Sequence, residues 1–206
     1  MKVLSAPQMR DVDRKTTEAG IPGLVLMENA GHRVVECLER EFAPLSRQHV
    51  VVLCGKGNNG GDGYVLARLA RTGGLRVRLA AVAGLPRPGS EADTARQGFI
   101  ACGGAEESVS VATLAQADVV VDALLGTGLD RPPPGPVADA IATVNACGRP
   151  VLSLDLPSGL NADTGQPYGE RIVRAAHTLS LLTLKPGLVT GQGRDVLRCD
   201  HWHGDI

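Results

Sequence analysis

The sequence has few aromatic residues, no excess of basic charge and no apolar run long enough to cross a membrane. Aromatic residues make up 2% of the 206 residues, and the formal net charge is −1. Because nucleic-acid binding usually needs a basic surface and aromatic side chains that stack on bases, we expect no nucleic-acid partner. The longest apolar runs, such as VVVLC and LSLLTL, have the length of a strand, and the opening MKVLSAPQMRD contains no signal-peptide segment. We therefore expect a cytoplasmic protein without a membrane partner.

The cysteines form no CxxC pair and their number is odd, so neither a zinc site nor a disulfide framework is expected. Most of them should instead be small buried hydrophobic residues. They are Cys37, Cys54, Cys102, Cys147 and Cys199. Glycine and proline are abundant, with 26 and 13 residues, and they gather at the ends of apolar runs, where loops that approach a ligand are expected.

Two helical patterns open the chain, and strand-like and helical patterns alternate from residue 49 onward. Ser5 and Gln8 form a capping box that predicts a first helix, and a second helix is expected after Pro22. The strand-like runs are residues 49–54, 75–83, 117–125, 150–156 and 177–184. Their continuous Val and Leu content is typical of parallel strands covered on both faces. The sequence therefore predicts a single α/β domain over residues 1–206, a Rossmann-like three-layer sandwich with a mostly parallel central sheet.

Polar or glycine-rich segments follow four of the five predicted strands. The loop GKGNNGGDG follows the first strand, and Asp122 with GTGLD ends the third. Asp155 with PSG ends the fourth strand, and Lys185 ends the fifth. In open parallel sheets ligands bind beyond the carboxyl ends of the strands, so we expect these segments to share one rim.

The glycine loop contains Gly55, Gly57 and Gly60 in the spacing GxGxxG, which binds dinucleotide phosphates through backbone N–H groups at a helix start. Alone, this spacing is weak evidence. The acid that would hold the ribose is missing from the end of the next strand, which reads AAVAG, so a hydride-transfer dehydrogenase or a methyltransferase is disfavoured. The P-loop spacing GxxxxGKS/T is not matched either.

Each of these features also has a purely structural interpretation. The glycines could serve a tight turn, although a turn does not require the asparagines and the aspartate beside them. Asp122 and Asp155 could cap a following helix or turn, and Lys185 could be a surface lysine before a turn. Their joint occurrence at matching strand ends favours a binding site.

The segments LMENAG, CGKGNNGGDGYVLARLA, VDALLGTGL, SLDLPSGLNADTG and LTLKPGLVTGQG occur in this order along the chain. Together they resemble the YjeF N-terminal domain family, the NAD(P)H-hydrate epimerases. The resemblance spans nearly the whole chain, and the combination of NNGGDG, DALLGTG and DxPSG is highly specific; only the final RCDHWHGDI departs from the usual ending. In many bacteria this domain is fused to a dehydratase domain, so we expect either a stand-alone epimerase or one domain of a bifunctional protein.

The resemblance implies an isomerase that interconverts the R and S forms of hydrated NADH or NADPH (NADHX and NADPHX) in nicotinamide nucleotide repair. By carry-over from the family, Asn59, Asp122 and Ser158 would bind one potassium ion per subunit, and Asp155 would contact the substrate. These oxygen ligands, with a single carboxylate, suit a monovalent hard cation. Backbone donors for the pyrophosphate and ribose are expected from two glycine-rich segments, which are Asn58, Asn59, Gly60, Gly61 and Asp62, and Gly126, Thr127, Gly128, Leu129, Asp130, Arg131 and Pro132. The family also implies a homodimer.

The chemistry of this substrate suggests a mechanism. The hydroxylated carbon is bonded to the ring nitrogen, so nitrogen-assisted departure of hydroxide gives a planar cationic carbon that water re-enters from either face. One group must protonate the leaving oxygen and another must activate water. Asp155 is the first candidate for this acid/base work and Lys185 is the second. The alternative is a non-catalytic module on the same fold that binds a nucleotide or a protein, with Asp155 only capping a turn.

Overall fold

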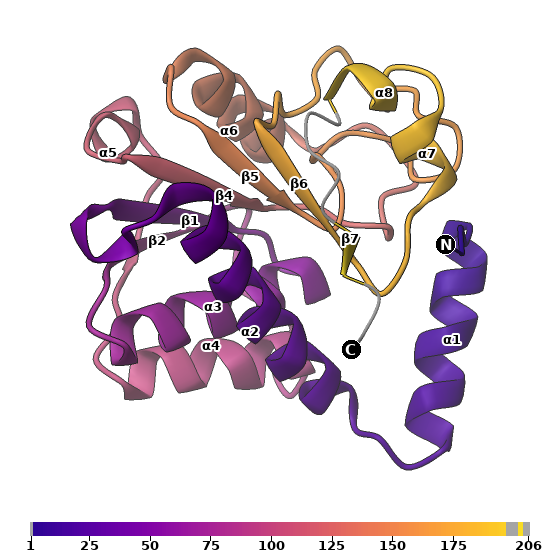
Figure 1. Ribbon diagram of the computed structural model, residues 1–206, viewed down its shortest axis with the longest axis horizontal. Helices are drawn as coiled ribbons and strands as arrows, with labels where there is room; N and C mark the ends of the chain where they lie inside the picture. Colours follow the sequence, from indigo (N-terminus) through magenta and orange to yellow (C-terminus); the bar gives the residue numbers. More distant parts are fainter. Residues whose placement is uncertain (1, 197–201, 204–206) are drawn as a thin grey trace.

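The computed structural model describes residues 2–196, 202 and 203, and its centre is a parallel β-sheet (Figure 1). Within these residues the sheet has seven strands in the order β3-β2-β1-β4-β5-β6-β7, and every pairing is parallel. The strands are β1 (His49–Cys54), β2 (Arg76–Ala81), β3 (Glu106–Glu107), β4 (Val119–Ala123), β5 (Val151–Leu154), β6 (His177–Leu181) and β7 (Trp202–His203). The strand order reverses between β1 and β4, which is where open α/β sheets bind their ligands.

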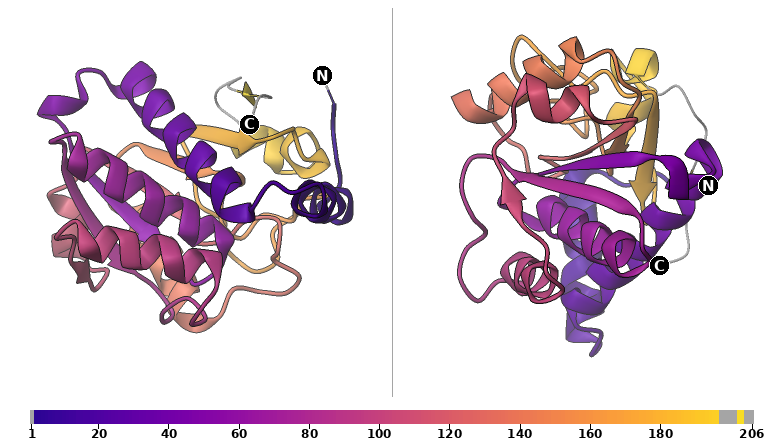
Figure 2. Two further views of the ribbon diagram at one scale, coloured as in Figure 1. Left: turned by 90° about the horizontal axis from the view of Figure 1, so that it is seen from below. Right: turned by 90° about the vertical axis from the view of Figure 1, so that its left-hand side faces the viewer.

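Helices cover both faces of the sheet, as the sequence predicts (Figures 1 and 2). Three helices, α2 (Gly23–Phe42), α3 (Asn58–Thr72) and α4 (Glu91–Ala101), pack against one another on one face. The opposite face carries α5 (Val111–Ala115) and α6 (Gly135–Ala146). The short elements η1 (Leu45–Arg47), α7 (Pro186–Val189) and α8 (Gly193–Val196) complete the described part of the chain. The expected three-layer α/β sandwich is confirmed.

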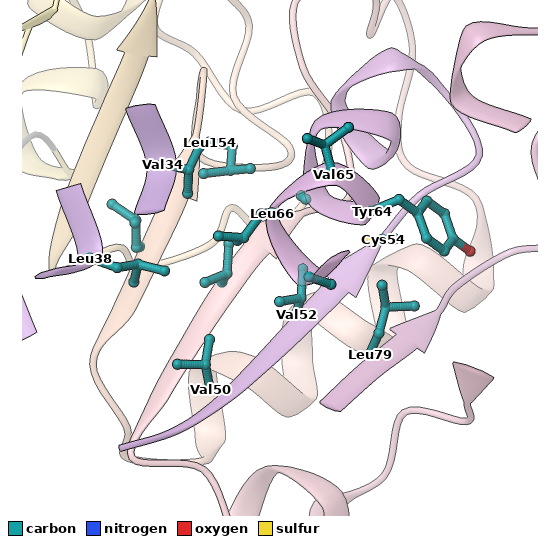
Figure 3. Close-up of a cluster of buried hydrophobic side chains, with 14 of the residues drawn as sticks. Val34, Leu38, Val50, Val52, Cys54, Tyr64, Val65, Leu66, Leu79 and Leu154 are labelled. Carbon is teal, nitrogen blue, oxygen red and sulfur yellow. The ribbon is translucent and has the colours of Figure 1, made fainter. Parts of the chain in front are cut away.

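Alternate residues of β1 enter two separate hydrophobic cores, which explains its continuous apolar run. Val52 and Cys54 join the core beneath α2, α3 and α4, whereas Val51 and Leu53 join the core beneath α6. Figure 3 shows the first of these cores, where side chains of α2 and α3 meet those of the central strands. Each fully buried Val or Leu contributes about 1.5–3 kcal/mol relative to an exposed one, so burial on both faces stabilises the sheet between its helices.

The first helix, α1 (Ala6–Glu18), stands beside the layers instead of lying on the sheet (Figures 1 and 2). Its start is tied to segments that follow β5 and β6. The N–H of Leu4 donates to the carbonyl oxygen of Leu184 at 3.0 Å, and the N–H of Ala6 donates to Asp163 Oδ1 at 2.7 Å. The helix is therefore anchored at the carboxyl edge of the sheet.

The predicted helices and strands are present, although the strands are shorter than the apolar runs. The first helix begins after Ser5 with the capping box to Gln8, and the second begins after Pro22. Strands β2, β4, β5 and β6 end before the apolar runs do, because the remaining residues turn away into the rim. Ser90, in the segment PRPGSEAD, caps α4 by accepting a hydrogen bond from the Asp93 N–H at 3.2 Å.

The prediction that GKGNNGGDG forms a loop holds only for residues 55–57 and is wrong from Asn58 onward, where α3 begins. A Cβ at Gly60 would lie 1.9 Å from the carbonyl oxygen of Gly55, and a Cβ at Gly63 would lie 2.7 Å from Cβ of Ala123. These glycines let the helix pack directly on the strands. The protein's own backbone and core, as well as any ligand, therefore exclude side chains from this segment.

The cysteines lie largely in the interior, as expected. Cys37 and Cys54 are buried, Cys102 and Cys147 are partly buried, and none of these four forms a disulfide among the described residues. Cys199 lies outside the described residues. Among the described helices, none combines the length and the apolar character needed to cross a membrane.

Candidate functional site

Asp122, at the carboxyl end of β4, holds together the loops that follow β4 and β5. Its side chain is fully buried. Oδ2 accepts hydrogen bonds from Ser153 Oγ at 2.8 Å and from the Ser158 N–H at 2.9 Å. Oδ1 accepts hydrogen bonds from Ser158 Oγ at 2.6 Å and from the Leu124 N–H at 3.2 Å. Ser158 Oγ also accepts from the Leu125 N–H at 2.9 Å, so the structure brings Asp122 and Ser158 into direct contact.

Burial raises the pKa of the Asp122 carboxyl, although the hydrogen bonds from Ser158 and Ser153 act in the opposite direction. Each carboxylate oxygen accepts two hydrogen bonds within the protein. Asp122 is therefore a buried acceptor that positions the two serines. Sequence analysis missed Ser153, whose signal was a single hydroxyl within the otherwise apolar run VLSL.

Asp155, directly after β5, is held by a buried lysine. Its backbone φ is 66°, in the left-handed region that is uncommon for residues other than glycine. Lys185 Nζ donates a hydrogen bond to Asp155 Oδ1, and the two side chains are 0% and 13% exposed respectively. The same Nζ donates to the Leu181 carbonyl oxygen at 2.7 Å and to Ser180 Oγ at 3.2 Å. All three ammonium donors of Lys185 therefore have acceptors within the protein.

This arrangement separates the two residues that the sequence suggested for acid/base work. Lys185 does not open onto the rim, because its side chain is fully buried and its donors are in use. Asp155 keeps a second oxygen, Oδ2, which lies beside Gly126. The geometry therefore makes Lys185 a support that orients Asp155.

Asn59 and Asp155 both lie next to Gly126, although they are far apart in the sequence. A Cβ at Gly126 would lie 3.3 Å from Asn59 Cβ, 3.4 Å from Asn59 Cγ and 3.3 Å from Asp155 Oδ2. Asn59 is 8% exposed, and neither atom of its side-chain amide has a hydrogen-bond partner within the described part of the chain. A buried amide without partners is costly, so such a group points to a ligand that would bind it.

Asp62 lies in the same N-terminal part of α3 and is partly exposed. Its carboxyl group has no hydrogen-bond or ion-pair partner among residues 2–196, 202 and 203. Burial raises the pKa of this carboxyl well above its usual value, and the negative charge of Asp155 adds to the effect. Asp13 and Glu91 raise the same pKa further, whereas Lys185 lowers it.

Asp13 of α1 is a residue near this site that sequence analysis missed. Burial and the charge of Asp155 raise the pKa of Asp13, and Lys185 lowers it. A signal was present in the sequence. Asp13 follows the buried Met9 by four residues, which places both on the same side of the helix.

The second glycine-rich segment joins the site only at its beginning. Gly126 lies between Asn59 and Asp155, and the N–H of Leu129 closes a turn by donating to the Gly126 carbonyl oxygen at 3.3 Å. The segment then runs out into solvent. Thr127 and Leu129 are partly exposed, and the exposed members of the segment are Gly128, Asp130, Arg131 and Pro132. In the first glycine-rich segment, Asn58 is exposed, whereas Gly60 and Gly61 are buried.

A family model described as YjeF-related protein N-terminus matches residues 23–187. The chain belongs to this family. The matched range contains strands β1 to β6 and every site residue described above except Asp13. The resemblance read from the sequence is therefore confirmed.

Two curated relatives and one solved structure illustrate the relationship. The bifunctional NAD(P)H-hydrate repair enzyme Nnr of Escherichia coli is 40% identical over 191 residues, which cover 90% of this chain and 36% of that protein. The NAD(P)H-hydrate epimerase of Limosilactobacillus fermentum is 39% identical over 196 residues, covering 94% of this chain and 91% of that protein. The chain thus spans about a third of the bifunctional relatives, with 36% coverage, and most of the epimerase. The yeast protein ynu0 has the same fold, with a TM-score of 0.83 at 24% identity over 92% of this chain and 84% of that one.

Proposed function

We propose that this protein is an isomerase that interconverts the R and S forms of NADHX and NADPHX, as part of nicotinamide nucleotide repair. The observation that carries the proposal is the convergence of Asn59, Gly126 and Asp155 at the carboxyl edge of the sheet. The names of the relatives, NAD(P)H-hydrate epimerase and NAD(P)H-hydrate repair enzyme, support the same reaction. The substrate class is a dinucleotide whose hydrated nicotinamide ring lies against Asp155.

The start of α3 suits the pyrophosphate of such a substrate. No side chain caps this helix, so its first N–H groups, from Asn58 to Gly60, have no helical acceptor. Free N–H groups and the positive end of the helix dipole favour a phosphate oxygen. We assign binding of the remainder of the dinucleotide to residues 126–132. The bound dinucleotide would then cover the exposed backbone of this turn.

In the proposed reaction, the lone pair of the ring nitrogen assists the departure of hydroxide from the neighbouring carbon. The planar cation that results accepts water from either face, which removes the stereochemistry. Asp155 performs proton transfer at this carbon, an effect that typically contributes about 10²- to 10⁴-fold. Lys185 keeps the Asp155 carboxylate in place through a buried ion pair and does not itself contact the ring.

We also propose one potassium ion per subunit, held by Asn59, Asp122 and Ser158. The donor set fits a monovalent cation, since Asn59 Oδ1 is a buried oxygen without a partner in the described chain and Asp122 supplies one negative charge nearby. Asp122 and Ser158 already accept hydrogen bonds from one another's loops, so Asn59 would be the open ligand. The ion would supply a fixed positive charge that balances Asp122.

A chiral assay with separately prepared R and S hydrates tests the proposal. The protein is expected to equilibrate either isomer faster than the reaction without protein, and Asp155→Asn is expected to lose about 10²- to 10⁴-fold in rate. Asp118→Asn is a matched control, because this exposed aspartate lies at the opposite edge of the sheet, before β4. If Asp155→Asn stays folded and keeps the wild-type rate, the assignment of Asp155 is wrong. If wild-type protein binds the hydrate without equilibrating it, the non-catalytic binding module is the correct reading.

The proposal extends to assembly and location. We propose a homodimer that works with an NAD(P)H-hydrate dehydratase in the cytoplasm, because some relatives are bifunctional repair enzymes. Light scattering during size-exclusion chromatography tests the dimer. A coupled assay tests the pairing, since a dehydratase specific for one isomer should consume a racemic hydrate completely only when this protein is added.

A further inference from the structure

A second carboxyl group, that of Asp62, lies in the same part of α3 as Asn59 and makes no hydrogen bond or ion pair within the described part of the chain. Asp62 follows Asn59 by three residues on α3, a spacing that places both side chains on one side of the helix. The neighbouring glycines face the interior instead. A Cβ at Gly61 would lie 2.6 Å from the sulfur of Met27, and a Cβ at Gly63 would lie 2.7 Å from Sγ of Cys54. Asp62 is thus a side chain that α3 directs away from the core at this point.

The surroundings of Asp62 and Asp155 differ in charge. Asp155 forms a buried ion pair with Lys185, whose Nζ donates a hydrogen bond to Asp155 Oδ1. Asp62 has no such partner in the described chain, and the acidic groups that act on it come from α1 (Asp13), from α4 (Glu91) and from the loop after β5 (Asp155). Two further titratable groups act with Asp62: the buried Lys185, which lowers the pKa of Asp62, and the buried Cys54 thiol at the end of β1. The two carboxyls therefore lie in unlike surroundings, since one is paired with a lysine and the other has acidic groups near it.

The unpartnered amide of Asn59 indicates that this pair of carboxyls faces a bound ligand. Asn59 is 8% exposed, lies on the same side of α3 as Asp62, and reaches the contact with Gly126 that also includes Asp155 Oδ2. Two carboxyls in unlike environments on either side of a reacting group are the usual arrangement for an acid and a base.

Resting on the proposed epimerase function, we propose that Asp62 is a second catalytic residue, which acts with Asp155 on opposite faces of the hydrated ring. The neutral Asp62 donates its proton to the hydroxyl, the C–O bond breaks with its electron pair going to the departing water, and the lone pair of the ring nitrogen forms a C=N bond. A second water adds to the other face, and its proton passes to the Asp155 carboxylate. Asp62 then carries the charge and Asp155 the proton, which is the state required for the reverse reaction, and exchange with solvent restores the starting state.

The burial of Asp62 gives this proposal a pH signature. Because burial and the surrounding acids raise the pKa of Asp62, its neutral form persists to higher pH than that of an ordinary aspartic acid. Activity should therefore fall as the pH rises through this pKa. Asp13→Asn removes one of the negative charges that raise it, so the alkaline fall should move to lower pH in that variant.

The experiment compares wild type, Asp62→Asn and Asp62→Glu in the chiral assay as a function of pH. Asp62→Asn should lower kcat by about 10²- to 10⁴-fold with a smaller change in KM, and it should lose the alkaline limb, whereas Asp62→Glu should restore part of the rate. Wild-type rates or an unchanged alkaline limb in a folded Asp62→Asn variant would overturn the proposal.

Infrared difference spectra of wild type minus Asp62→Asn decide the protonation state without any activity. A protonated-carboxyl band is expected at pH values above the usual aspartate pKa, and its absence there would overturn the proposal. If wild-type protein does not epimerise the hydrate, the proposed function fails by that result, and the infrared band still reports separately on Asp62.

Discussion

Replacing Asn59 by leucine should make the protein more stable while removing ligand binding. Both atoms of the Asn59 amide are buried without partners in the described part of the chain. A buried polar group left unsatisfied costs about 1–3 kcal/mol in protein mutational data. Leucine has nearly the same shape and no polar atoms, so Asn59→Leu removes this cost. The side chain has room for the added hydrogens, because its neighbour Gly126 carries no Cβ.

We expect Asn59→Leu to raise the free energy of unfolding by about 1–3 kcal/mol, measured by urea unfolding in a buffer without potassium. For a chain of this size each kcal/mol raises Tm by about 2–4 °C. Addition of potassium should stabilise wild type by about 1.4 kcal/mol at a tenfold excess over Kd, and should leave Asn59→Leu unchanged. Asn59→Ala is the control for side-chain volume, since it removes the same amide but leaves a cavity.

The outcome that would refute this reasoning is a folded Asn59→Leu protein that is less stable than wild type without potassium. Asn59 would then be satisfied by contacts within the protein, and its amide would be no sign of a ligand. A potassium response that survives in Asn59→Leu would remove Asn59 from the proposed ligand set.

Three further predictions follow from the same contacts. Lys185→Met leaves the Asp155 carboxylate without its buried counter-charge and should lower the free energy of unfolding by about 3–5 kcal/mol in urea, with partial recovery when Asp155→Asn is added. Gly126→Ala places a Cβ 3.3 Å from Asp155 Oδ2, and it should lower kcat/KM by about tenfold or more while the urea midpoint changes little. The Arg96 guanidinium lowers the pKa of Glu106, so this pair stabilises the fold above the usual glutamate pKa and the contribution is lost as the pH falls. Acid unfolding followed by circular dichroism should accordingly be less steep in Glu106→Gln, and equal steepness would contradict the assignment.

The position of the rim was readable from the sequence because strand ends are marked locally. Asp122 and Asp155 each follow a Val- or Leu-rich run directly, and parallel strands bring their carboxyl ends to one edge. The role of Lys185 was not readable in this way. Whether a lysine after a strand faces solvent or the interior depends on the hydrogen-bond acceptors around it. Here one acceptor comes from Asp155, far from Lys185 in sequence, and another from Leu181, close to it.

The amino-acid sequence by itself determined the parallel sheet, its helical layers and the family, because burial on both faces and the spacing of the glycines are local properties of the chain. Only the tertiary structure decided that Gly60 and Gly63 serve helix packing, that the Asn59 amide lacks a partner in the described chain, and that the charge of Asp155 raises the pKa of Asp13 of α1. These properties depend on distances between segments far apart along the chain. Such distances are set by how the layers pack, and no local pattern records them.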